Sequence, residues 1–113
     1  MSTLIDKLDA VESRHTEVTR RLSDPAVLAD PAEYQRLARL HAELIPVVEE
    51  YRRLKKLQRE LEEARGLLRE TIDPEMRALA ETELQSLTEK REALEATLQL
   101  LLLPKDPADE RNI

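Results

Sequence analysis

Apolar residues recur at steps of three and four positions through most of this chain, and this spacing limits the folds available to it. Such steps place side chains on one face of an α-helix. The first stripe consists of Leu4, Leu8, Val11, Val18 and Leu22. Its steps are regular if His15 occupies the helical position between Val11 and Val18. A second stripe comprises Leu37, His41, Leu44, Val48, Tyr51, Leu54, Leu57, Leu61, Ala64 and Leu68. In the third, Arg91 fills a gap among Ala80, Leu84, Leu87, Leu94, Leu98 and Leu101.

The composition excludes most alternatives to helix. The 113 residues include one glycine, no phenylalanine or tryptophan and no cysteine, and charged residues make up 37%. A sheet favours β-branched and aromatic residues together with turn glycines, and this chain is poor in them. We therefore predict an all-α fold in a single domain covering residues 1–103.

Asp-Pro dipeptides mark where the helices begin. Asp accepts a backbone hydrogen bond as an N-cap, and Pro suits the first helical position because its missing N–H is not needed there. Asp24-Pro25, Asp30-Pro31 and Asp73-Pro74 fit this pattern, and Thr3 with Asp6 resembles a first cap. The sequence predicts helices near 3–22, 32–71 and 74–102, with a turn or short helix at 24–30.

Helices of these lengths joined by short connections favour an elongated, antiparallel three-helix bundle or helical hairpin with coiled-coil-like packing. The second helix would be about 60 Å long at 1.5 Å per residue. Because the first helix is shorter, part of the hairpin should be only two-stranded. Pro46 lies inside the second helix, where we expect a kink. A leftover apolar stripe would allow self-association.

We find no catalytic constellation in the sequence. A phosphate-binding loop needs several glycines, and the chain has one. His15 and His41, the two histidines, lie on different predicted helices without the spacing of a metal motif. They could meet and bind a metal, but a histidine at the edge of an apolar stripe favours a structural role. We predict a non-enzymatic chain with no cofactor and no metal.

We expect a cytoplasmic location and no membrane partner. The longest apolar run, Leu100–Leu103, is far shorter than the roughly 20 residues that cross a bilayer. Residues Met1–Lys7 lack the basic and apolar blocks of a secretion signal. The net charge of −6 and the pI of about 5.0 argue against broad, non-specific nucleic-acid binding.

A local basic cluster interrupts this acidic chain. Arg52, Arg53, Lys55, Lys56 and Arg59 place five positive charges within eight residues. One interpretation is contact with phosphates or with an acidic protein surface. The other is a solvated face that complements acidic neighbours. No aromatic residues alternate with the cluster, which argues against stacking on single-stranded nucleic acid.

The sequence resembles bacterial peptide chain release factor one along essentially its whole length. The segment Leu100–Asn112, with its Leu-Leu-Leu-Leu-Pro-Lys-Asp-Pro block, is similar to the linker between the N-terminal helical domain and the central domain of that family. Similarity extends to Leu4–His15, to Leu22–Leu44 and to Asp73–Ala80. The linker block favours release factor one over release factor two.

The resemblance implies a role in translation termination at UAA and UAG stop codons. The codon-reading tripeptide and the Gly-Gly-Gln motif of the family have no counterpart in these 113 residues. What the resemblance implies here is the first domain, which reaches the stalk base of the large ribosomal subunit. The expected partners are the ribosome and the remaining domains of the factor, with residues 104–113 as a linker. Arg52, Arg53, Lys55, Lys56 and Arg59 become candidate ribosome contacts.

Two other classes fit the residues. One is a free-standing coiled-coil adaptor or a designed helical bundle, whose apolar stripes would close on themselves. The other is a tRNA-binding helical arm, which should be more uniformly basic than this acidic chain.

Overall fold

The computed structural model describes residues 3–104, and every regular element within them is a helix. The all-α fold class is confirmed. The three long helices begin and end within one residue of the ranges expected from the sequence, and a short helix occupies the segment between the first two. The elements are α1 (Leu4–Arg21), α2 (Pro25–Leu28), α3 (Pro31–Glu70) and α4 (Pro74–Leu101). Of the expected linker, residues 104–113, only Pro104 lies within the described part of the chain.

Local capping chemistry sets the start of each helix. Thr3 and Asp6 form a reciprocal capping box, in which each side chain accepts the backbone N–H of the other residue. The other three helices begin with proline after an aspartate whose carboxylate accepts a backbone N–H; these N-caps are Asp24, Asp30 and Asp73. The helix starts therefore follow from neighbouring residues alone.

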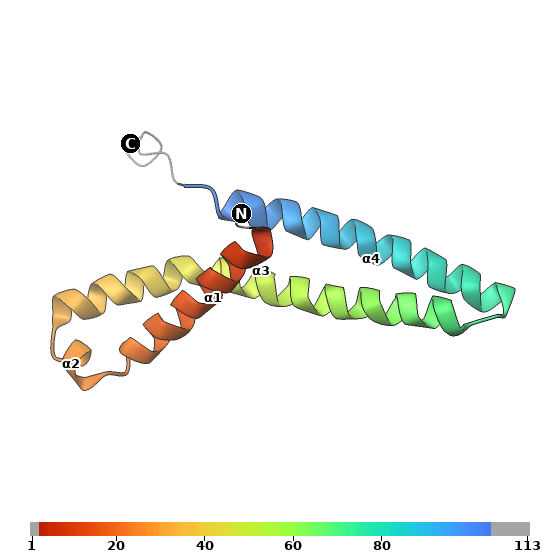
Figure 1. Cartoon of the computed structure of the whole chain (residues 1–113). Coiled ribbons are helices and arrows are strands. Elements are labelled where there is room, and N and C mark those ends of the chain that lie inside the picture. The colour runs from red at the N-terminus through yellow and green to blue at the C-terminus, as the bar shows by residue number, and fades with distance from the viewer. Residues whose placement is uncertain (1–2, 105–113) are drawn as a thin grey trace.

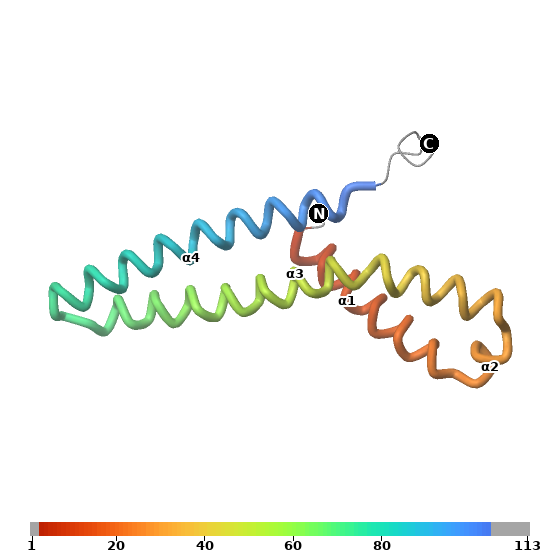
Figure 2. Tube along the Cα trace, turned by 180° about the vertical axis from the view of Figure 1, so that it is seen from behind, coloured from red at the N-terminus to blue at the C-terminus, as the bar shows by residue number. Residues whose placement is uncertain are grey.

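The long helix α3 is the element against which the others pack (Figure 1). α1 runs antiparallel to its first half and α4 runs antiparallel to its second half, so that α1 and α4 diverge from a meeting point near the middle (Figure 2). The resulting rod measures 64 × 36 × 27 Å. The three-helix section is confined to the middle of the rod, and two helices pair on either side of it.

Three separate apolar clusters hold this rod together. The central cluster joins α1, α3 and α4 through Leu8, Val47, Tyr51, Leu54 and Leu98. A second cluster joins α1, α2 and α3 through Val18, Val27 and Leu37. The third joins α3 to α4 through Leu61, Ala64 and Leu87. The central cluster is thus the one that involves all three long helices.

α3 continues through Pro46 without a break, and its middle section changes direction in both views (Figures 1 and 2). This agrees with the expected kink, because proline removes one backbone hydrogen bond and crowds the preceding turn. The next two residues, Val47 and Val48, are both buried. The apolar stripe predicted for this helix included Val48 but missed Val47. Two adjacent buried positions are possible because α3 meets partners on more than one side at this point.

Leu54 should be a critical residue for folding, because it is fully buried where the three long helices meet. We expect Leu54→Ala to lower the free energy of unfolding by about 2–5 kcal/mol through lost burial and the cavity left behind. Leu100→Ala is the matched control, since Leu100 is 69% exposed, and should change stability by less than about 0.5 kcal/mol. Urea unfolding followed by far-UV circular dichroism measures both; equal effects would contradict a central role for this cluster.

Candidate functional site

All five residues of the predicted basic cluster lie on α3, just beyond the bend and beside the central apolar cluster. Lys55 is half-buried, and the four exposed members are Arg52, Arg53, Lys56 and Arg59. The structure therefore brings the predicted residues together on one helix but gives them different surroundings.

Two members of the basic cluster already have acidic partners. The Lys55 Nζ donates to Glu12 Oε1 of α1 at 2.7 Å and lies 4.4 Å from the centre of the Tyr51 ring. Arg53 donates to Glu50 Oε1 one turn earlier on α3 at 2.9 Å. An attraction between Lys55 and the face of an aromatic ring adds to its ion pair. Lys55 therefore helps to hold α1 against α3, and Arg53 is partly neutralised.

The other three members carry the positive charge that remains available. Arg52, Lys56 and Arg59 make no hydrogen bond or ion pair within residues 3–104. Their spacing of four and then three residues places them on one face of α3. We call these three residues the cationic row. It is the part of the predicted cluster that is suited to an external anionic partner.

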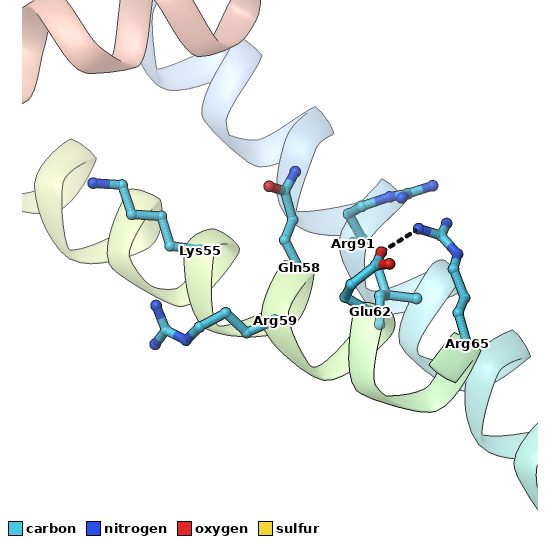
Figure 3. A pocket seen from close by; sticks show the side chains of 7 residues that line it. Lys55, Gln58, Arg59, Glu62, Arg65 and Arg91 are labelled. Carbon is cyan, nitrogen blue, oxygen red and sulfur yellow. Dashed lines mark hydrogen bonds and ion pairs between the residues drawn. The ribbon is translucent and has the colours of Figure 1, made fainter. Parts of the chain in front are cut away.

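A groove between α3 and α4 adjoins the cationic row (Figure 3). Its volume is about 520 Å³, and it is lined by Lys55, Gln58, Arg59, Leu61, Glu62, Arg65 and Arg91. Sequence reasoning did not connect Arg65 and Arg91 with the basic cluster. The one available signal was the position of Arg91, a charged residue in the middle of an otherwise apolar stripe.

A hydrogen bond beside the cationic row fastens α1 to α3. The Tyr51 hydroxyl donates to the carboxylate of Asp9. Burial raises the pKa of Tyr51 to about 12, and the hydrogen bond and negative charge of Asp9 act in the same direction. Tyr51 therefore remains a neutral donor at physiological pH, and the helix carrying the cationic row is held firmly in place.

The two histidines meet, as the sequence allowed. The His15 and His41 rings stack with their centres 4.8 Å apart, next to a hollow of about 260 Å³ that Glu49 and Arg52 help to line. No group of three or more histidine, aspartate or glutamate side chains suited to a metal occurs within residues 3–104. Burial lowers the pKa of His15, and the nearby His41 and Arg52 lower it further, while Glu12 opposes them.

Among residues 3–104, no helix is long and apolar enough to cross a membrane. The fold and surface define a rod-like helical domain whose distinctive chemistry is exposed positive charge on an acidic chain. The chain belongs to the PCRF domain family, which matches residues 11–113.

Three curated relatives of this chain share the name peptide chain release factor 1. The chain is 46% identical over 110 residues to peptide chain release factor 1 of Carboxydothermus hydrogenoformans, covering 97% of this chain and 31% of that protein. Peptide chain release factor 1 of Acidobacterium capsulatum is 46% identical over 97% of this chain and 30% of its own length. The corresponding protein of Geobacter sulfurreducens is 44% identical over the same shares. The resemblance stated from the sequence is therefore confirmed. This chain spans about 30% of the length of these relatives, and no solved structure matches it.

The stacked histidines should make stability depend on pH. Since the folded protein lowers the pKa of His15 below its ordinary value of 6.5, the unfolded chain binds a proton more readily. The free energy of unfolding should therefore fall as the pH drops below 6.5 and should level off below the lowered pKa. Thermal unfolding measured at intervals from about pH 8 to about pH 5 tests this.

His15→Gln provides the comparison, because it removes this titration and leaves the surface carboxylates in place. The unfolding temperature of the variant should fall less steeply below pH 6.5 than that of the unaltered chain. Parallel curves for the two proteins would show that His15 does not control the response.

Proposed function

We propose that this chain is the N-terminal helical domain of a peptide chain release factor that directs translation termination at UAA and UAG codons. The support is similarity to peptide chain release factor 1 over 97% of the chain. On this proposal its partners are the ribosome and the remaining domains of the same factor, and it acts in the cytoplasm.

Within that factor, the domain serves as a docking element for the stalk base of the large ribosomal subunit. The observation that supports this role is the cationic row, Arg52, Lys56 and Arg59, which is exposed and free of ion pairs within residues 3–104. Ribosomal RNA presents a dense array of phosphates, and unpaired cations on a well-packed helix suit such a partner.

The domain itself is non-catalytic on this proposal. The Gly-Gly-Gln motif that the resemblance implies for peptide release needs two adjacent glycines, and the sequence contains only Gly66. The groove and the histidine hollow both lie on the surface between helices, where water has access. Hydrolysis and codon reading belong to other parts of the factor, and this domain contributes to binding.

Reversing the charge of the cationic row tests the proposed docking. We expect the triple variant Arg52→Glu, Lys56→Glu, Arg59→Glu to bind purified large ribosomal subunits at least about 10-fold more weakly at moderate salt. The reason is the loss of three phosphate contacts and the introduction of repulsion. Sedimentation of the labelled domain with the subunits measures the affinity.

A control with the same change in net charge separates local contact from general repulsion. Arg20, Arg36 and Arg39 are exposed cations on α1 and the first part of α3, away from the cationic row, and their triple reversal should weaken binding much less. Far-UV circular dichroism must show that both variants remain helical. Equal losses for the two triple variants would contradict docking through the cationic row.

A further inference from the structure

The groove between α3 and α4 concentrates positive charge on an acidic molecule. Its lining contains four cations, Lys55, Arg59, Arg65 and Arg91, and one carboxylate, Glu62, whereas the whole chain has a net charge of −6. Carboxylates outside the lining pair with two of these cations, Glu12 with Lys55 and Glu95 with Arg91. Such local concentration against the overall sign favours a bound anion over simple solvation.

Among these cations, Arg91 has a buried donor atom that is unsatisfied within residues 3–104. Its side chain is only 26% exposed, and its Nε lies 3.3 Å from Glu95 Oε1, within ion-pair distance. The buried Nε nevertheless donates no hydrogen bond within residues 3–104. Buried donors nearly always find an acceptor, and an arginine presents five N–H groups in a rigid fork. The Arg91 Nη groups make no hydrogen bond within residues 3–104 on a side chain that is partly exposed, so they are placed to donate to an external oxygen ligand.

Arg65 extends toward the same end of the groove as Arg91, although the two residues come from different helices (Figure 3). The carboxylate near Arg65 is Glu62, at a long 3.4 Å, and Glu62 also lies 3.9 Å from Arg69. One carboxylate shared between two arginines leaves much of their charge uncompensated. Two guanidinium groups at one end of a groove suit an anion that accepts several hydrogen bonds at once.

The groove adjoins the cationic row at Arg59, which belongs to both, whereas Arg52 and Lys56 do not line it. From Arg59 to Arg65, α3 rises about 9 Å at 1.5 Å per residue. A nucleic-acid strand places more than one phosphate over such a length. The lining contains no aromatic side chain on which an unpaired base could stack. This arrangement suits the backbone of a folded RNA better than its bases.

We infer that the Arg65–Arg91 end of this groove is a phosphate-binding site for the backbone of double-helical RNA. The inference rests on the proposed function, since it assigns the RNA side of the ribosome contact to residues outside the predicted basic cluster. Arg91 and Arg65 donate to phosphate oxygens, and Arg59, which also lines the groove, binds a neighbouring phosphate of the same strand.

Binding of the whole 113-residue chain to a fluorescein-labelled RNA hairpin tests the site. The double variant Arg65→Gln, Arg91→Gln should bind about 10-fold more weakly or worse. Its plot of log affinity against log salt should be shallower by about 1 to 2. Arg20→Gln, Arg36→Gln is the matched control, with the same loss of charge outside the groove, and should bind like the unaltered chain.

A conservative variant distinguishes the arginine fork from charge alone. Arg91→Lys keeps the charge but loses the planar fork, so we expect a loss of affinity between those of the control and the double variant. Unfolding temperatures measured in parallel show whether each variant is folded. If the double variant is unfolded, the single variant Arg65→Gln, at an exposed position, decides by the same salt dependence.

The outcomes separate this inference from the proposed function. Unchanged RNA binding by the folded double variant overturns the groove site, as does tighter binding of a labelled polyglutamate peptide than of the RNA hairpin. If the unaltered chain and the double variant bind large ribosomal subunits equally, the groove site fails and the proposed function stands. If the unaltered chain does not bind the subunits but binds the hairpin more tightly than the double variant does, the groove site stands and the proposed function fails.

Discussion

Packing of α1, α3 and α4 around Leu54 is the constraint on which the rest of the molecule depends. The central apolar cluster contains side chains from all three long helices, including Leu8 and Leu98. A thin helical rod buries little surface for its length, so one shared junction contributes much of its cohesion. The two paired regions on either side extend from this junction. The cationic row begins immediately beside it, on the part of α3 that packs against both α1 and α4.

Polar contacts reinforce the same junction and connect it with the surface chemistry. Tyr51 belongs to the central cluster and also donates its hydroxyl to Asp9, while Lys55 spans from the Tyr51 ring to Glu12. These contacts fix α1 on α3 and direct one cation of the basic cluster inward. Arg52, Lys56 and Arg59 consequently face outward without partners within residues 3–104. Burial and ion pairing thus give Lys55 a structural role and leave the cationic row available for binding.

Features set by near neighbours in the chain could be predicted from the sequence. The N-caps at Asp30 and Asp73, the helix lengths and a bend in the middle of α3 depend on local hydrogen bonding and sterics, and the structure has them as expected. Burial of Val47 was missed because it requires knowing that α3 has partners on two sides. The groove was missed for a similar reason. Arg65 and Arg91 line one groove only once α3 and α4 adopt a particular register, which periodicity does not specify.

The domain boundary at residue 103 and the linker beyond it remain predictions, as does the ribosome contact. The family assignment rests on sequence similarity along the chain. The proposed docking rests instead on the exposed positive charges of the cationic row. The proposed role in termination depends on both. Self-association of this chain is also untested. Docking is the central question because function resides in the sites that a fold carries, and the exposed cations of α3 are the candidate site of this rod.

The most direct measurement is binding of the unaltered chain to purified large ribosomal subunits over a salt series, beside subunits that lack the stalk base. The account predicts saturable binding that requires the stalk base and weakens steeply as salt rises, because phosphate contacts release counterions. Binding that is equal with and without the stalk base, or insensitive to salt, would contradict docking through the basic surface of α3.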